Sequence, residues 1–490
     1  RLQDSAAEHK WRSAWSLSRP PLESCSDVAV GRELLAELSS QSGHECVAEA
    51  GELYVYNTSL GIWEPVDEIR AAQLVQGYEG RPYYGGFEKD GRPKIKKLQL
   101  RKHQVDGAVS SAVVSAHKAR FFEEALSGIC VANGVLQITA QGAKLLPHSP
   151  EHRMRVALPF EYHAASQAPR WQQYLQEVFD GADGGSSARL LQEFVGACLL
   201  GQAPRWQKCL VLYGTGANGK SATGEVLSGL FPSNACSSVR PHDLGHEYSR
   251  AMLVGKYLNV VGDMPSGNIK STDLFKAVVV GDEIQARNPY HRVFSFRPRA
   301  GHLFSTNEVL HTRDTSKGYW RRFMILEYSV EFQGANEVKG LGKRIVKSEL
   351  PGVLTWAVQG AVRLLQNDEY TVPESSLKLI AEWRKSADQV AIFVHEKCRP
   401  VLARVVGASS YTSTATLYVN YGVWAENSGH RALSKSKFSR RLKALGYEQQ
   451  RTAGCRGYPL QVLECIDEPF DWDSYQRAQR KANDGSMTDE

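Results

Sequence analysis

The chain has 490 residues, a length that predicts about three domains at roughly 150 residues each. Its 42% apolar and 23% charged residues exclude a disordered chain or a coiled-coil rod, and no apolar run is long enough for a membrane helix. The formal net charge is +6, and the nine cysteines form no CxxC pair. We therefore expect reduced thiols in a cytoplasmic protein.

The first part of the chain is predicted to contain a lead-in and one α+β domain. Residues 1–50 are mixed and polar, and only 31–40 is expected to be helical. Short strands and turns predict an α+β domain over residues 51–204 that ends in two helices. The clearest strands and the two helices are expected at 52–57, 132–139, 169–179 and 186–201.

Between residues 208 and 330, short apolar runs alternate with helical or loop segments. This alternation is typical of a mostly parallel sheet in an α/β domain. The apolar runs are CLVLYG, YLNVVGD, HLFSTN and RFMILEY. We expect the α/β domain to extend over residues 205–385, with a helical C-terminal part.

Residues 214–221, GTGANGKS, match the phosphate-binding pattern GxxxxGK[ST]. The motif follows an apolar strand and precedes a helical stretch, which is the context that a phosphate-binding loop requires. Its glycines allow backbone N–H groups to turn toward phosphate oxygens at the positive end of the following helix. We expect ATP to bind at Gly214, Thr215, Gly216, Ala217, Asn218, Gly219, Lys220, Ser221 and Ala222.

Four side chains are candidates for the chemistry at such a loop. Lys220 would reach the β and γ phosphates, and the Ser221 hydroxyl would bind Mg²⁺. Asp263 ends the next apolar strand as a second metal ligand, unless it only forms a turn before a proline. Asn307 ends a third strand, where it could orient the attacking water or simply cap the strand.

Two arginines, Arg321 and Arg322, precede the last apolar run of this region. A guanidinium is planar and permanently charged, so it suits the oxygens of a phosphoryl group in its transition state. An arginine supplied by a neighbouring subunit would complete the site. A head-to-tail interface of this kind either closes into a ring, as we expect here, or continues as a filament. A surface salt bridge is the alternative interpretation.

Basic residues are concentrated near the C-terminus. From His430 to Arg456 there are eight Lys and Arg residues but one acid. The sequence predicts a Ser-capped amphipathic helix followed by a strand hairpin, which together indicate a winged helix within residues 386–466 and a tail at 467–490. A solvated charged face is the alternative. The expected DNA contacts are Lys435, Lys437, Arg440, Arg441, Lys443, Arg451 and Arg456.

Taken in order, these motifs resemble superfamily 3 helicases of the phage, plasmid and poxvirus primase-helicase type. The resemblance covers roughly residues 50–330 and includes LYGTGANGKS, LNVVGDMP, HLFSTNEV and GYWRRFMILEY. It implies an α/β fold, in which a P-loop AAA+-like ATPase domain follows an α+β N-terminal domain and precedes a winged helix.

The resemblance also implies a function and residue roles. It implies an ATP-dependent DNA helicase or translocase that acts in the replication of a mobile element in a bacterial cytoplasm. It also implies that the protein forms a hexameric ring on single-stranded and duplex DNA. Lys220 and Ser221 would belong to the Walker A loop, Asp263 would be the Walker B acid, and Asn307 the sensor. Arg322 is preferred to Arg321 as the arginine finger. A hairpin into the central pore would contribute Tyr290, His291, Arg292 and Lys276.

Some expectations remain open. The family usually has Glu at the position of Asp263, which leaves three alternatives. Asp263 serves alone as the Walker B acid, Asp282 or Glu283 assists it, or ATP hydrolysis is slow. The Asp471-x-Asp473 pair follows no apolar strand, so we expect primase activity from a partner rather than from this chain. A phosphotransferase of small substrates is disfavoured by the basic C-terminal segment. An ATP-controlled DNA-binding switch without processive unwinding is the alternative function.

Overall fold

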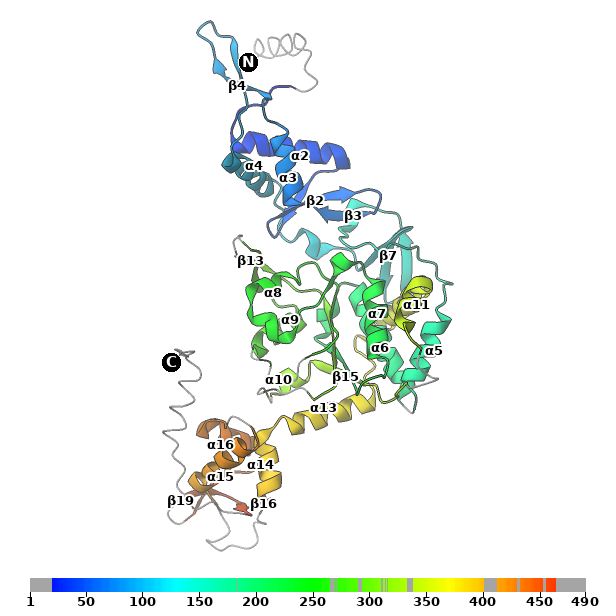
Figure 1. Ribbon diagram of the computed structural model, residues 1–490, viewed down its shortest axis with the longest axis vertical. Coiled ribbons are helices and arrows are strands. Elements are labelled where there is room, and N and C mark those ends of the chain that lie inside the picture. The colour runs from blue at the N-terminus through cyan, green and yellow to red at the C-terminus, as the bar shows by residue number, and fades with distance from the viewer. Residues whose placement is uncertain are drawn as a thin grey trace. The chain divides into compact units, whose positions relative to one another are not determined.

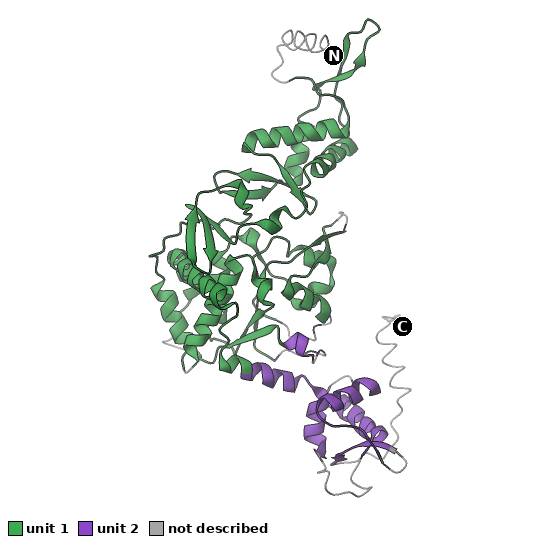
Figure 2. Ribbon diagram, turned by 180° about the vertical axis from the view of Figure 1, so that it is seen from behind, with its two compact units in different colours: residues 1–308, 321–377 green, residues 309–320, 378–490 purple. Residues whose placement is uncertain are grey.

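The computed structural model describes residues 20–181, 183–264, 269, 271–289, 293–309, 312, 314, 316–332, 338–400, 412–429, 432–452 and 455–463. The chain divides into two compact units, one of residues 1–308 and 321–377, the other of 309–320 and 378–490 (Figure 2). Within the described residues, no helix has the length and apolar character needed to cross a membrane.

The first unit begins with an N-terminal body built on helix α2 (Asp27–Ser42). The Ser26 hydroxyl caps this helix by accepting a hydrogen bond from the Ala29 N–H, and Leu34 and Leu38 are buried against α4. Residues from 20 onward are therefore part of a folded body, and not the lead-in predicted for residues 1–50. Its other elements are β1 (Val47–Glu49), β2 (Glu52–Asn57), β3 (Ile62–Pro65), α3 (Glu68–Gln76), β4 (Pro82–Phe87), β5 (Pro93–Lys97) and α4 (Lys102–Ser115).

A three-stranded antiparallel sheet and two helices connect this body to the main sheet. The predicted helices are confirmed within two residues at each end, because their apolar residues recur at helical spacing and are buried. The elements are β6 (Gly128–Val131), β7 (Gly134–Thr139), β8 (Gly142–Leu146), α5 (Pro169–Val178) and α6 (Gly184–Leu199).

The main sheet has five parallel strands in the order β10-β11-β14-β9-β15. Its edge strand β15 is labelled in Figure 1. All six residues of β14 are buried, which explains why these strands read as continuous apolar runs in the sequence. The α/β prediction is thereby confirmed. The strands are β9 (Cys209–Tyr213), β10 (Cys236–Ser237), β11 (Leu258–Val261), β14 (Gly301–Thr306) and β15 (Phe323–Glu327).

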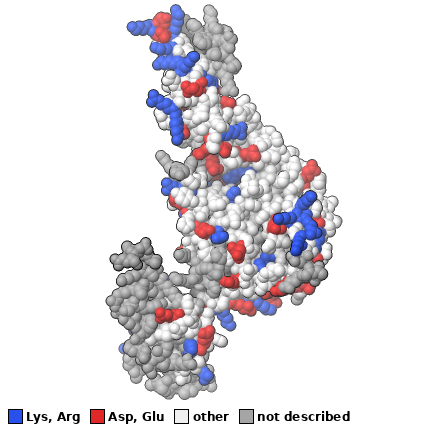
Figure 3. Space-filling model, viewed as in Figure 1, with Lys and Arg blue, Asp and Glu red and all other residues white. Residues whose placement is uncertain are grey.

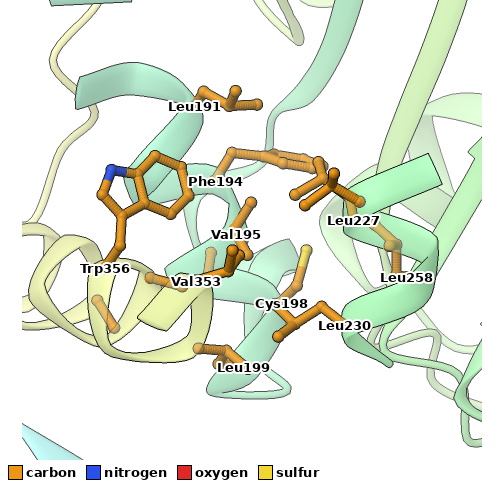
Figure 4. Packing of buried hydrophobic residues seen from close by; sticks show 14 of the residues in the cluster. Leu191, Phe194, Val195, Cys198, Leu199, Leu227, Leu230, Leu258, Val353 and Trp356 are labelled. Carbon is orange, nitrogen blue, oxygen red and sulfur yellow. The ribbon is translucent and has the colours of Figure 1, made fainter. Parts of the chain in front are cut away.

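Helices α6 and α12 cross closely beside the sheet. A Cβ atom on Gly196 would lie 2.4 Å from the Ala361 backbone nitrogen, so only glycine permits this approach. Side chains of α6 also contact α7 and β11 in one apolar cluster (Figure 4). The remaining elements of this region are α7 (Lys220–Leu230), α8 (Glu247–Ala251), α9 (Thr272–Val280), β12 (Ile284–Arg287), β13 (Val293–Phe296), α11 (Leu341–Ser348) and α12 (Leu350–Asn367).

The second unit packs three helices on small antiparallel sheets, around buried Phe393, Tyr421 and Phe438. It starts eight residues before the predicted boundary, within the connecting helix α13 (Glu374–Ser386). Its elements are α10 (Lys317–Trp320), α14 (Gln389–Lys397), β16 (Cys398–Pro400), β17 (Thr412–Ser413), α15 (Thr414–Asn427), α16 (Lys435–Ala444), β18 (Gln450–Thr452), β19 (Cys455–Tyr458) and β20 (Leu460–Val462). The predicted tail at 467–490, with Asp471 and Asp473, lies outside the described residues.

Burial of His302 in β14 generates a prediction about pH. Desolvation lowers the pKa of His302 to about 4, whereas an exposed histidine titrates near 6.5. Between these values the unfolded chain binds the extra proton, so we expect stability to fall with decreasing pH by up to about 1.4 kcal/mol per unit. Urea unfolding of the parent and of His302→Asn from pH 7.5 to 4 measures this component. Equal pH dependence in the two proteins would contradict it.

Candidate functional site

The phosphate-loop motif lies at the carboxyl edge of the main sheet. Residues 214–219 connect the end of β9 to the start of α7. Tyr213, the last residue of β9, is in register with Thr306 of β14, and the Gly214 N–H donates to the Thr306 carbonyl at 3.3 Å. The loop therefore starts directly beside the end of β14, at the edge where open α/β sheets bind their ligands.

Asp263 and Asn307 are brought to the same edge. Asn307 follows Thr306 directly, and both Asn307 and Asp263 are exposed. The Met264 N–H donates to the Ser305 carbonyl at 2.8 Å, so the segment with Asp263 remains hydrogen-bonded to β14 beyond the end of β11. Since β14 lies between β9 and β11, Asn307 is central and Asp263 lies on its far side from the loop.

The loop backbone requires glycine at two positions. Gly219 has φ 94°, and a Cβ there would lie 2.8 Å from the Tyr174 hydroxyl oxygen. A Cβ on Gly214 would lie 2.3 Å from the Tyr328 carbonyl oxygen. At Gly216 a Cβ would meet no atom within 4 Å, so the protein itself does not require glycine there. Ala217 adopts the left-handed region at φ 56°, a strain that is typical of functional sites.

Lys220 is folded back onto its own loop. Its Nζ donates to the carbonyl oxygens of Gly214 at 2.6 Å and Thr215 at 2.7 Å, and to Asn218 Oδ1 at 3.0 Å. Burial lowers the pKa of Lys220, while the negative charge of Asp263 partly opposes that shift. The three acceptors place the ammonium group inside the loop.

A buried chain of hydroxyl groups supports the loop from below. The Tyr174 hydroxyl of α5 donates to the Gly219 carbonyl at 2.7 Å and contacts Thr223 Oγ1 at 2.8 Å, and Thr223 contacts the Tyr328 hydroxyl at 2.9 Å. Asn218 Nδ2 also donates to the Tyr328 carbonyl at 2.9 Å. Sequence reasoning missed Tyr174 and Tyr328, since each reads as an ordinary apolar position of a helix or strand end.

A cavity of about 510 Å³ opens beside the loop, within the size range of small-molecule sites. Its lining includes residues 216–222, Asp263 and Asn307, together with Glu225, which sequence reasoning also missed. Asp282 and Glu283 are absent from the described lining, so an assisting role for either is not supported. An apolar side is formed by Phe332, Val338 and Leu341.

The residues present fit Mg²⁺ only together with a phosphate ligand. Among the described residues, no group of three or more His, Cys, Asp or Glu side chains is placed to hold a metal. Mg²⁺ commonly binds through one or two protein oxygens plus substrate phosphates, and Ser221 and Asp263 offer such a pair at the cavity.

The two arginines lie at the opposite edge of the sheet. The Cys209 N–H at the start of β9 donates to the Arg322 carbonyl at 2.7 Å, and Lys208 Nζ donates to the Arg321 carbonyl at 2.6 Å. The four residue steps of β9, about 13 Å, therefore separate them from their own loop. Arg322 is only 8% exposed, whereas Arg321 is exposed and donates to Gln207.

The predicted hairpin is present as the antiparallel pair β12–β13, in which Arg287 is in register with Val293. Its expected DNA contacts Tyr290, His291 and Arg292 lie outside the described residues. Lys276 is on α9, before the hairpin, and pairs with Asp273 at 2.8 Å.

The basic residues of the second unit differ in availability. Lys435, Lys437, Arg440 and Lys443 are exposed on α16, and in the described part of the chain none of them forms an ion pair. Arg441 is different, because its guanidinium binds the buried Asp388 carboxylate at 2.5 and 2.7 Å. Asp388 in turn caps α14. The structure thus assigns Arg441 a structural role, and not the predicted DNA contact.

Lys435 and Arg456 line a shallow hollow of about 830 Å³ between α15, α16 and β19. Arg456 is directly opposite Arg451 in the β18–β19 pair, and both residues are exposed. Like charges opposite each other destabilise an antiparallel pair, so this arrangement favours an anionic ligand.

Comparisons with known proteins add two partial matches. Residues 33–180 match the family described as D5 N terminal like, and residues 212–322 match a family of unknown function, DUF5906. Residues 33–180 are therefore similar to a domain of the D5 N-terminal type. No curated protein matches the chain.

Solved structures of the NrS-1 C-terminal region are similar at a distance. The apo A form covers 88% of this chain and 98% of its own, at 10% identity and a TM-score of 0.44. A second apo A form, of residues 305–718, covers 90% of this chain and 100% of its own, at 11% identity and a TM-score of 0.40.

Adjacent arginines on α16 provide a matched test of the structural assignment. Arg441→Ala leaves the buried Asp388 carboxylate without its cation, and we expect it to destabilise the second unit by about 3 kcal/mol. Arg440→Ala removes the same charge from an exposed position and should change stability by less than about 0.5 kcal/mol. Calorimetry of the full chain measures both, and equal effects would contradict the assignment.

Proposed function

We propose that the protein is an ATP-dependent DNA helicase or translocase of the superfamily 3 type. The observation that carries this proposal is the convergence of the phosphate loop, Asp263 and Asn307 at the ends of β9, β11 and β14, around one cavity. These elements supply the phosphate cradle, the metal ligand and the water-orienting amide that P-loop ATP hydrolysis requires.

Lys220 has to move when nucleotide binds. Its three present acceptors are loop atoms, and a phosphate oxygen offers the ammonium group a stronger, charged acceptor. The start of α7 directs backbone N–H groups at the same anion. Ser221 and Asp263 would hold Mg²⁺, which would supply positive charge against the phosphates. The apolar side of the cavity would hold the adenine base.

The position of the arginines supports action between subunits. Arg321 lies at the far edge of the sheet from its own loop, so within one subunit it is not placed to contact the γ-phosphate. A head-to-tail interface repeated by rotation would bring it to the neighbour's loop and close a ring, for which the resemblance implies six subunits. Because Arg322 is buried, we now prefer Arg321 as the finger.

DNA binding is assigned to the second unit and to the β12–β13 hairpin. The unit has the order of a winged helix: α14, a short strand, α15, α16 and the β18–β19 hairpin. Exposed cations on α16 would contact duplex phosphates, and Arg451 and Arg456 would form a basic wing. The D5 N-terminal type of residues 33–180 supports a role in phage or plasmid replication, with a primase or polymerase as a partner.

Removal of the Lys220 ammonium group tests the site directly. We expect Lys220→Ala to abolish ATP hydrolysis and ATP-dependent strand displacement, because the Lys220 ammonium group is the loop cation that would contact the β and γ phosphates. Lys343→Ala, an exposed lysine on α11, is the control and should retain both activities. DNA binding without strand displacement by the parent protein would favour the DNA-binding switch instead.

Mixed oligomers test whether the finger acts between subunits. We expect Arg321→Ala to assemble with an ATP analogue and single-stranded DNA but to hydrolyse ATP roughly 10³-fold more slowly. Arg322→Ala should mainly lower thermal stability, since that side chain is buried. Mixing Arg321→Ala with Lys220→Ala subunits should restore hydrolysis where an intact loop meets an intact arginine. Failure of the mixture to recover activity, although mass measurements show mixed oligomers, would refute the arrangement.

A further inference from the structure

The antiparallel pair of β4 and β5, residues 82–97, carries a second concentration of positive charge. We call it the β4–β5 ribbon. Within it the sequence has five Lys and Arg residues and two acids. The ribbon extends beyond α2, α3 and α4 in Figure 1, and Figure 3 shows Lys and Arg gathered on it. Neither of the sites described above includes it.

Most of this charge is available for a ligand. Arg81 is committed to Glu33 at 2.8 Å, and Arg92 pairs with Asp90 at 3.2 Å. The lysines of the ribbon differ from these two arginines, because all of them are exposed and none forms an ion pair within the described residues. They are Lys89, Lys94, Lys96 and Lys97.

One face of the ribbon also exposes an aromatic ring. Tyr84 is in register with Ile95, and Phe87 with Pro93, so these side chains share a face because residues two apart in a strand point the same way. Phe87 is 78% exposed, among the largest exposures of any large apolar side chain in the described chain. Lys97 lies on this face, and Lys94 and Lys96 lie on the other.

The combination of exposed lysines and an exposed aromatic ring on the ribbon is explained by a ligand. Lysines on exposed strands also prevent pairing with other chains, and that would explain the charge alone. It does not explain Phe87, because an exposed ring at the end of a ribbon promotes the association that the lysines would prevent. Cations that follow a phosphate backbone, next to an aromatic platform for bases, are the combination that binds single strands without sequence preference.

We propose that the β4–β5 ribbon binds single-stranded nucleic acid. The Phe87 ring stacks on an unpaired base, and Lys97 contacts a phosphate on the same face. Lys94 and Lys96, on the opposite face, contact phosphates where the single strand passes around the edge of this two-stranded ribbon. A duplex offers the same phosphates, but its base faces are covered by stacking, so only an unpaired strand uses the ring. The site is independent of ATP hydrolysis and of the second unit, and it stands whether or not the proposed helicase function holds.

Binding of a fluorescent oligothymidine, and of a duplex of equal length, to the full chain without nucleotide tests this proposal. We expect Lys94→Ala/Lys96→Ala/Lys97→Ala to reduce the slope of log affinity against log salt by about 2, at 0.7 per lost phosphate contact. Phe87→Leu keeps an apolar side chain but lacks the ring, and should weaken single-strand binding roughly 5- to 150-fold. Phe87→Trp keeps an aromatic ring and should retain single-strand binding. Neither Phe87 variant should alter duplex binding.

Three controls make the outcomes decisive. Lys144→Ala/Lys343→Ala/Lys347→Ala removes equal charge from exposed sites elsewhere and should leave the salt slope unchanged. The effects of the ribbon variants on binding should persist when Lys437→Ala/Arg440→Ala weakens DNA binding by the second unit. Photocrosslinking from benzoylphenylalanine at position 87 should label the single strand. The proposal is overturned if Phe87→Leu and Phe87→Trp bind alike, if both lysine triples have the same effect, or if position 87 labels only duplex.

Discussion

Strand direction in the main sheet is the constraint on which the candidate site depends. All five strands are parallel, so whatever follows β9, β11 and β14 must emerge at one edge, and whatever precedes β9 and β15 must lie at the other. The loop, Asp263 and Asn307 meet for this reason. The same rule separates Arg321 from its own loop. One geometric property thus assembles most of the proposed hydrolytic site and leaves out the part that a neighbouring subunit would supply.

The loop is supported by segments that are distant in sequence. Tyr174 of α5 contacts the Gly219 carbonyl from below, and Tyr328, directly after β15, holds Asn218 through its carbonyl oxygen. Glu349 accepts hydrogen bonds from the N–H groups of Arg170 and Trp171 at the start of α5. Helix α5, the residue after β15 and the connection between α11 and α12 therefore fix one strained loop together, and a shift in any of them changes where a phosphate would sit.

Positive charge in this protein is divided between structure and ligands, and burial decides which. Arg441 and Arg440 are adjacent, yet one neutralises a buried carboxylate and the other is exposed. Arg81, just before the β4–β5 ribbon, pairs with the half-buried Glu33, whereas Lys94 on the ribbon is exposed. A count of net charge hides this division. The C-terminal segment alone carries a net positive charge at least as large as that of the whole chain. The net charge of the chain therefore did not indicate the basic residues of the ribbon, because acids elsewhere balance them.

The sequence by itself determined the parallel α/β sheet, helices α5 and α6 and the phosphate loop, because periodicity and glycine spacing are local properties of a chain. It also indicated Asp263 and Asn307, since polar residues that end buried strands must gather at one edge. Only the tertiary structure decided that Tyr174 and Tyr328 support the loop and that Glu225 lines the cavity. It likewise decided that Arg322 is buried and that the half-buried Arg441 pairs with Asp388, while Arg321 and Arg440 are exposed. Long-range packing sets burial and hydrogen-bond partners, and no pattern within a single segment encodes them.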